Sequence, residues 1–219
     1  MTKSPILVAI VGGSGSGKTW LADKLQADLG PKAARLSLDD FYRDRSGLSP
    51  ARRATINFDH PRAIDWKSLE RVLLDCRAGK AARLPCYDFK THCRLRASNV
   101  LKPKPVILVD GLWLLRRPSI RRFFGLRIFL ECPASLRLRR RLARDVLTRG
   151  RTRASIEKQF WNTVEPMHLK YVAPQIRWAN VVLHDDCGKG EIEKLAAQLR
   201  AGVSHFSRSV FNAPPQAMT

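Results

Sequence analysis

A glycine-rich stretch near the start of the chain contains the residue types that bind phosphate. Residues 12–19 fit the phosphate-loop pattern G-x-x-x-x-G-K-T. Glycines let the backbone form a concave turn with inward-pointing N–H groups, and the helix that follows adds N–H donors and the positive end of its dipole. We therefore predict a site for a nucleoside triphosphate. The loop residues are Gly12, Gly13, Ser14, Gly15, Ser16, Gly17, Lys18 and Thr19.

Two residues of this loop have more specific expected roles. In this pattern the Lys18 ammonium reaches the β- and γ-phosphates, and the Thr19 hydroxyl holds Mg²⁺. A flexible glycine/serine linker is the alternative interpretation. The stretch lies between an apolar run and a helix-like segment and ends in Lys-Thr, which a linker does not need. The context therefore favours phosphate binding.

Acidic side chains follow two other apolar runs. Asp39 and Asp40 come directly after residues 34–38, and Asp110 ends the run at 106–109. Ligands of open parallel sheets bind at the carboxyl ends of the strands, so we expect these carboxylates beside the phosphate loop. Asp110 is predicted to support Mg²⁺, with a helix cap as the alternative. Asp39 and Asp40 are candidates for the general base that a hydroxyl acceptor requires, and spacing alone does not choose between them.

The chain is strongly basic, with 40 Lys and Arg against 19 Asp and Glu and a formal net charge of +21. Such a charge fits either a nucleic-acid surface or a site for highly anionic small molecules. Arginines concentrate in residues 137–153, a helix-like segment that leads into a loop. Guanidinium groups match phosphate geometry, and a mobile flap would keep water out of a phosphoryl transfer. We predict a lid here, with a solvated basic helix as the alternative.

The rest of the chain predicts an α/β fold. Apolar runs separated by helix-like segments indicate βαβ units in a parallel sheet. The expected strands are 6–11, 34–38, 106–109, 127–130 and 181–183. The expected helices are 18–29, a helix capped by Asp65, the arginine-rich helix and 154–178. Two short strands within 83–104 form an expected hairpin outside the main sheet.

The predicted organisation is one domain, residues 1–204, followed by a loose polar tail at 205–219. No apolar run reaches about 18 residues, so we expect no membrane span. The five cysteines contain no C-x-x-C pair, which favours reduced thiols of a cytoplasmic protein over a zinc site.

Several motifs together resemble the uridine kinase, or uridine–cytidine kinase, family of P-loop kinases. They are GGSGSGKT, LDDFYR, NFDHPRAID, LPCYDFKTHCR, VILVDG, RRRLARDVLTRGRT and FWNTVEPMHLKYVAP. The resemblance implies Mg²⁺-dependent transfer of the γ-phosphate of ATP or GTP to the 5′-hydroxyl of uridine or cytidine, in pyrimidine salvage. It also implies a P-loop NTPase-type parallel β-sheet of about five strands flanked by helices, with a β-hairpin over the nucleoside and an Arg-rich lid. Members of the family are commonly homo-oligomers, tetramers or dimers.

The family's functional residues can be transferred to matching positions of this chain. Asp39 resembles the catalytic base, acting with Lys18 and the lid arginines Arg144 and Arg149. Arg149 and Arg151 are implied nucleotide contacts, and the implied metal ligands are Thr19, Asp110 and Asp39. The implied substrate-binding residues are Asp39, Tyr42, Asp59, Tyr87, His92, Arg141 and Gln159.

Two features leave other interpretations open. The family usually has Glu at the position of Asp110, and the shorter side chain favours a Mg²⁺ contact through water. Tyr87, Phe89, His92 and Arg94 could bind a base or sugar, or could be structural. The alternative functions are a P-loop kinase of another small hydroxyl substrate, such as a different nucleoside or a sugar phosphate, and a nucleotide-dependent nucleic-acid-binding protein.

Overall fold

The computed structural model describes residues 4–185, 187–202 and 209–210, without the side chains of residues 54, 148, 149, 209 and 210. A parallel sheet forms its centre, in the strand order β2-β5-β1-β6-β7-β8. The strands are β1 (Ile6–Gly12), β2 (Ala33–Ser37), β5 (Val106–Gly111), β6 (Leu126–Leu130), β7 (Val181–Leu183) and the two-residue β8 (Ser209–Val210). The five predicted strands are therefore confirmed, whereas most of the predicted tail lies outside the described residues.

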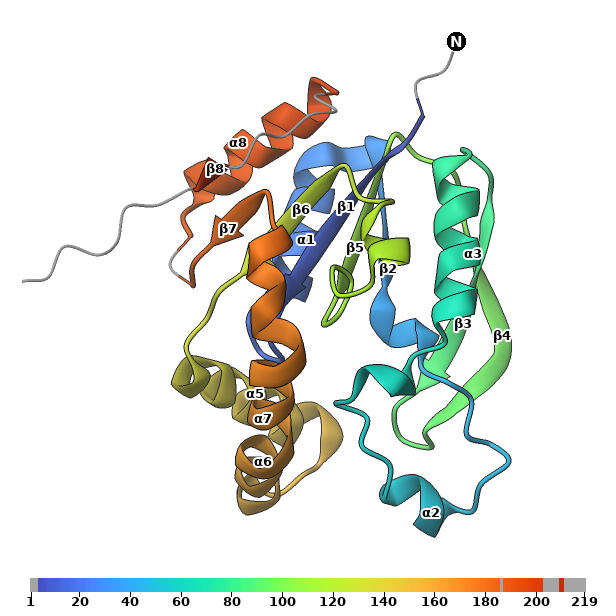
Figure 1. The fold of residues 1–219 in the computed structure, drawn as a ribbon, viewed down its shortest axis with the longest axis vertical. Helices are drawn as coiled ribbons and strands as arrows, with labels where there is room; N and C mark the ends of the chain where they lie inside the picture. Colours follow the sequence, from blue (N-terminus) through green and yellow to red (C-terminus); the bar gives the residue numbers. More distant parts are fainter. Residues whose placement is uncertain (1–3, 186, 203–208, 211–219) are drawn as a thin grey trace, which may run out of the picture.

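Helices cover both faces of the sheet, which explains why its strands are almost continuously apolar. Alternate residues of β1 point to opposite faces, so Leu7 and Val11 join one core and Val8 and Ile10 join the other. One core is covered by α3 (Trp66–Arg77). The other is covered by α1 (Lys18–Leu29) and α8 (Lys189–Arg200) (Figure 1).

The helix boundaries follow from local sequence signals. Helix α1 ends at Gly30, whose φ of 57° lies in the left-handed region that glycine adopts without strain. The Asp65 carboxylate accepts a hydrogen bond of 3.1 Å from the backbone N–H of Ser68 and caps α3, as predicted. The short elements are α2 (Pro50–Ala54), α4 (Pro118–Arg121) and the 3₁₀ turns η1 (Gly30–Lys32), η2 (Leu38–Phe41) and η3 (Pro61–Ala63).

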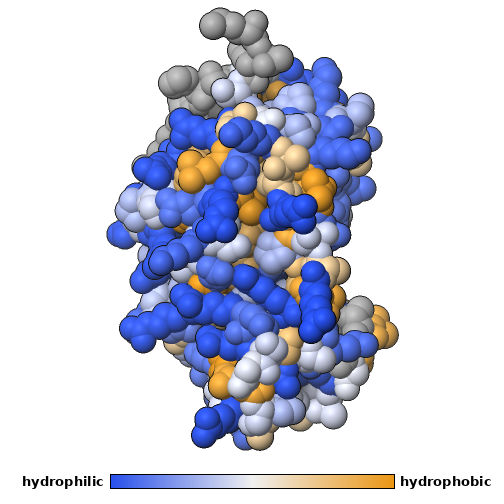
Figure 2. All heavy atoms as spheres, turned by 90° about the vertical axis from the view of Figure 1, so that its right-hand side faces the viewer, coloured by the Kyte–Doolittle hydropathy of each residue, from blue (hydrophilic) through white to orange (hydrophobic). Residues whose placement is uncertain are grey.

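An antiparallel hairpin stands apart from the sheet, beside α3 (Figure 1). Its strands are β3 (Ala82–Asp88) and β4 (Cys93–Leu101), close to the predicted range. The pairing register shifts between Pro85 and Tyr87, where proline has no N–H to donate. Figure 2 shows this side of the molecule, where hydrophilic residues dominate and apolar ones form scattered small groups.

The predicted arginine-rich helix and the helical stretch after it form a second layer at the carboxyl end of the sheet (Figure 1). Helix α5 (Ala134–Arg149) ends at Gly150, with φ 60°. The stretch expected at 154–178 is helical, but it is divided around Pro166, because proline cannot donate a helical hydrogen bond. Its parts are α6 (Arg153–Gln159), the π-turn η4 (Phe160–Val164), α7 (Glu165–Met167), the π-turn η5 (His168–Val172) and the 3₁₀ turn η6 (Ala173–Trp178). None of the described helices is long and apolar enough to cross a membrane.

Candidate active site

A large cavity opens at the carboxyl ends of β1 and β5 and has a volume of about 1120 Å³. Its wall contains part of the phosphate loop, the end of β5, the η2 turn, the hairpin tip and the arginine-rich helix. A pocket for one small ligand is commonly about 300–1,000 Å³. The cavity is therefore large enough for two ligands bound side by side.

The phosphate loop has the curvature that its glycines predict. Gly15 and Gly17 have φ values of 83° and 97°, which favour glycine over any residue with a side chain. Lys18 follows directly, and its ammonium donates a hydrogen bond of 2.7 Å to the Gly13 carbonyl across the loop. Burial lowers the pKa of Lys18 to about 8, although the nearby carboxylates of Asp39 and Asp110 act to raise it. An anionic ligand here would favour the charged lysine.

The structure divides the predicted loop residues into two groups. Those that line the cavity are Ser14, Gly15, Gly17, Lys18 and Thr19. Gly12, Gly13 and Ser16 do not line it. A Cβ at Gly13 would lie only 2.8 Å from both Arg137 Cδ and His168 Nδ1, so this glycine is required for close packing behind the loop. Loop glycines therefore serve both the cavity and the support beneath it.

That support contains charged groups that are almost fully buried. The Arg137 side chain is 2 % exposed, and it donates hydrogen bonds to the Cys132 carbonyl at 3.0 Å and to Glu165 Oε2 at 2.6 Å. Beside it, burial lowers the pKa of His168 to about 4, and the charges of Arg137 and Lys18 add to this effect. His168 is therefore neutral at physiological pH. A neutral ring limits the positive charge accumulated behind the loop.

The carboxylates predicted at the strand ends differ in position. Asp39 and Asp110 line the cavity, whereas Asp40, the other candidate base, does not. Burial raises the pKa of Asp40 to about 6, and Asp39 and Asp110 raise it further. Asp110 is 4 % exposed, and its Oδ1 accepts a hydrogen bond of 3.0 Å from Arg35 Nε. The sequence analysis did not identify Arg35.

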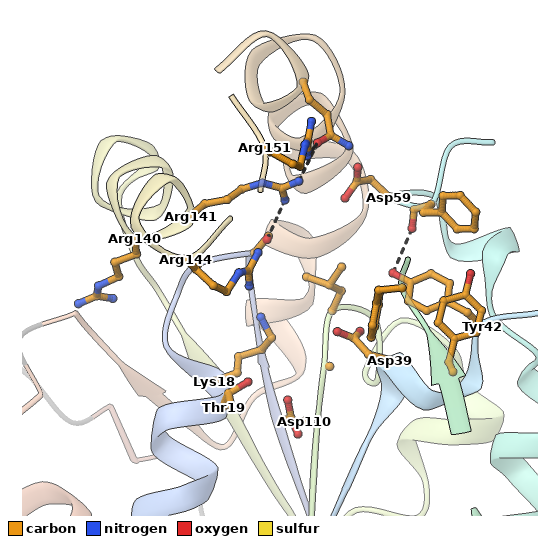
Figure 3. A pocket seen from close by; sticks show the side chains of 18 of the residues that line it. Lys18, Thr19, Asp39, Tyr42, Asp59, Asp110, Arg140, Arg141, Arg144 and Arg151 are labelled. Atoms are coloured by element: carbon orange, nitrogen blue, oxygen red, sulfur yellow. Dashed lines mark hydrogen bonds between the residues drawn. The ribbon is translucent and has the colours of Figure 1, made fainter. Parts of the chain in front are cut away.

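The donor set beside the loop fits a magnesium ion. Thr19, Asp39 and Asp110 all line the cavity next to Lys18, and they offer only oxygen ligands (Figure 3). Mg²⁺ usually takes one or two carboxylates and completes its shell with water and substrate phosphates. Within the described residues, no three or more His, Cys, Asp or Glu form a cluster that could hold a metal ion. With Arg35 bound to one of its oxygens, Asp110 is restrained in the position that it would present to an ion.

Aromatic rings form the opposite end of the cavity. The rings of Tyr42 and Tyr87 pack 5.2 Å apart, and the Tyr42 hydroxyl donates a hydrogen bond of 3.2 Å to the Phe58 carbonyl. His92, at φ 56°, stacks on Phe58 with ring centroids 4.2 Å apart and planes 12° from parallel. All four residues line the cavity. Phe58 was not predicted as a site residue, although its motif was recognised.

Asp59 lies between this aromatic end and the arginines (Figure 3). Burial raises its pKa above the ordinary value, whereas the guanidinium groups of Arg141 and Arg151 act to lower it. Residues from opposite sides of the cavity therefore interact electrostatically across it. Arg94, considered a possible ligand contact, does not line the cavity. Its guanidinium instead bonds to the Tyr42 carbonyl at 2.9 Å and pairs with Asp65 at 3.2 Å.

The lid arginines form one connected network. Arg141 donates to Ser14 Oγ at 3.0 Å and to Gln159 Oε1 at 2.9 Å, and Arg151 donates to the same Gln159 oxygen at 2.5 Å (Figure 3). Asp145, with no exposed surface, accepts a 2.8 Å hydrogen bond from Arg144 and pairs with Arg141 at 3.4 Å. The predicted residues Arg141, Arg144, Arg151 and Gln159 therefore meet at the cavity wall. The side chain of Arg149 lies outside the described structure.

Sequence analysis did not identify Asp145, although a signal was present. It is the only acidic residue between Ala134 and Gly150, and it follows Arg141 by four residues, which places the two on one helix face. An isolated acid in a basic helix indicates a partner for the arginines around it. Arg35 gave no comparable signal, because its partners are distant in sequence.

Solved structures share this architecture. A putative fructose transport system kinase from Silicibacter sp. superposes with a TM-score of 0.65 at 22 % identity, covering 81 % of this chain and 87 % of that one. Phosphoribulokinase from Rhodobacter sphaeroides superposes with a TM-score of 0.63 at 18 % identity, covering 84 % and 71 % of the two chains. At these identities the likeness shows the fold alone, which is that of the P-loop kinases.

Sequence comparison then identifies the family. The sequence model of the phosphoribulokinase / uridine kinase family matches residues 7–186, and the chain belongs to this family. A uridine kinase from Chloroflexus aurantiacus is 40 % identical over 183 residues, covering 83 % of this chain and 88 % of the relative. A uridine kinase from Brevibacillus brevis is 38 % identical over 181 residues, covering 82 % and 85 %.

Proposed function

We propose that this P-loop kinase transfers the γ-phosphate of ATP or GTP to the 5′-hydroxyl of uridine or cytidine. The main supporting observation is the position of Asp39. Its carboxylate acts electrostatically on both Lys18 of the phosphate loop and Tyr42 of the aromatic end. A base between these two groups is where an acceptor hydroxyl and a transferring phosphoryl group would meet.

Each end of the cavity has its own task in this proposal. Lys18 and the loop N–H groups hold the triphosphate, and the guanidinium groups of Arg144 and Arg151 stabilise charge on the phosphoryl group. Tyr87 and His92 bind the pyrimidine, and Asp59 accepts hydrogen bonds from the ribose hydroxyls. Asp39 removes the proton from the 5′-hydroxyl as this oxygen bonds to the γ-phosphorus and the bond from the γ-phosphorus to the departing ADP or GDP breaks.

Thr19, Asp110 and Asp39 would hold Mg²⁺, which supplies charge neutralisation of the phosphates when bound. Arg35 keeps the Asp110 carboxylate in place. The hydrogen-bonded network of Arg141, Arg151 and Gln159 closes the cavity wall above the acceptor. This closure limits the access of water and therefore the loss of ATP by hydrolysis.

The test is a coupled ADP-release assay with Mg·ATP and a panel of uridine, cytidine, adenosine, guanosine, thymidine and nicotinamide riboside. We expect turnover with uridine and cytidine only. Asp39→Asn should reduce kcat by at least about 100-fold, the usual contribution of a positioned base, and should leave ADP binding intact.

Asp40→Asn is the matched control, because Asp40 is adjacent in sequence but does not line the cavity. It should retain most of the wild-type turnover. Full activity of Asp39→Asn would contradict the assignment of the base. No turnover with any nucleoside, with ADP still bound, would contradict the acceptor and direct attention to sugar phosphates or to a nucleic acid.

A further inference from the structure

One part of the cavity wall has no role in the proposal above. Trp20, Asp23 and Arg140 line the cavity together with the phosphate loop. Trp20 and Asp23 are three residues apart on α1, so they share a helix face. Arg140 belongs to α5, and its Nη1 donates a hydrogen bond of 3.3 Å to the Ser16 carbonyl. These residues extend the cavity beyond Thr19.

Trp20 is unusual because its large apolar ring is exposed inside a binding cavity. The side chain is 49 % exposed, although it comes directly after the Lys-Thr of the phosphate loop. Within the described residues, no other ring or cationic group stacks on its indole. Exposing an indole to water gives up the burial that normally stabilises such a side chain. A flat ligand would restore that burial.

The direction of a bound nucleotide follows from the arrangement of the cavity. Its phosphates lie at Lys18 and Thr19, and the acceptor occupies the aromatic end at Tyr42 and Asp59. Figure 3 shows Arg140 on the other side of Lys18 and Thr19 from Tyr42 and Asp59. The base of the nucleotide must therefore extend away from the acceptor, over the beginning of α1.

We propose that the Trp20 indole is the surface on which the base of the phosphate donor stacks. This inference rests on the proposed function only for the location of the acceptor. Stacking on an aromatic ring tolerates every base, because each has a π-face. Trp20 would thus give affinity without selecting adenine over guanine, and both ATP and GTP would serve as donors.

The experiment measures nucleotide binding without any acceptor. ADP, GDP and tripolyphosphate, which has no base, are titrated by calorimetry into the wild-type protein, Trp20→Ala and Trp20→Phe. Trp161→Ala is the matched control, because Trp161 is 52 % exposed and does not line the cavity. Alanine is the best helix former, so Trp20→Ala should keep α1 folded, which thermal unfolding verifies.

We expect Trp20→Ala to weaken the binding of ADP and GDP at least about fivefold, which is the lower limit for the loss of one base–aromatic stack. Trp20→Phe should retain most of the affinity, and tripolyphosphate should bind all four proteins equally. A loss below fivefold, or an equal loss of tripolyphosphate affinity, would overturn the proposal. Failure of the uridine assay would leave these binding results unchanged, so the two proposals fail independently.

Discussion

The aromatic end and the lid end of the cavity are stabilised in different ways. At the aromatic end, Tyr42 and Tyr87 are 7 % and 6 % exposed and pack on one another, so burial holds them in place. At the lid end, Arg141 and Arg144 share the carboxylate of Asp145, and Arg141 and Arg151 share Gln159. Several cations there depend on few acceptors.

This difference has a consequence for ligand binding. The aromatic rings are held in place without a ligand, because Tyr42 and Tyr87 pack on one another and the Tyr42 hydroxyl already has a hydrogen-bond partner. The lid end retains excess positive charge, and an anion between the guanidinium groups would relieve their mutual repulsion. Three substitutions test whether stability depends on packing at the aromatic end and on paired buried charges elsewhere around the cavity.

The largest effect is expected from Asp145→Asn. Removing the charge of a fully buried carboxylate leaves Arg141 and Arg144 without their shared partner, which should cost about 3 kcal/mol of unfolding free energy. Urea denaturation measures it. Glu157→Gln, which removes the exposed pair with Arg153 at 3.7 Å, is the control and should cost less than about 1 kcal/mol. Equal losses of unfolding free energy in the two variants would show that the buried lid charges contribute no more to stability than an exposed ion pair.

A smaller, pH-dependent effect is expected at His168, behind the phosphate loop. Its pKa of about 4 lies below the ordinary 6.5, so the unfolded chain binds a proton between these pH values and the folded protein does not. Stability from this group is therefore complete above pH 6.5 and is lost as the pH falls through 4. When the pH is lowered from 7 to 4, the free energy of unfolding of His168→Gln should therefore fall by about 2 kcal/mol less than that of the wild type.

Urea denaturation at both pH values measures this difference. His184→Gln, which removes an exposed histidine, is the control and should follow the wild type. If His168→Gln also followed the wild type, the neutral state of the buried His168 ring would not be a source of pH-dependent stability.

The smallest effect is expected at the aromatic end. Tyr42→Phe removes the 3.2 Å hydrogen bond to the Phe58 carbonyl but keeps the ring, so it should cost about 1 kcal/mol. Thermal unfolding measures the change, and the KM for uridine should rise more than the KM for ATP. A loss as large as that of Asp145→Asn would mean that polar contacts, and not packing, hold this end.

The sequence was sufficient for the parts of the molecule that local patterns determine. Continuous apolar runs gave the five strands, and the P-loop spacing placed Lys18 and Thr19 at the cavity. The motif resemblance assigned Tyr42, Tyr87 and Gln159 to one binding site, and all three line the cavity. Strand ends of a parallel sheet meet at one edge, so Asp39 and Asp110 could be predicted to lie together.

Contacts between distant residues could not be predicted. Arg35 and Asp110 are 75 positions apart, and their pairing depends on the register between β2 and β5. Spacing alone also did not distinguish Asp39 from Asp40, because a one-residue step in the η2 turn decides which side chain reaches the cavity. Local sequence fixes the elements, whereas their packing selects the partners of each charge.

The contact between Gly15 and Arg137 has a mechanical consequence for the lid. A side chain at Gly15 would overlap the main-chain carbonyl of Arg137, so the first turn of α5 rests directly on the phosphate loop. The part of α5 from Arg137 to Arg149 spans about 18 Å, and a rotation of about 10° around this contact would displace the far end by about 3 Å. The phosphate loop would act as the pivot of this rotation, so a small change in the loop where the phosphates bind would produce a larger displacement at the C-terminal end of α5.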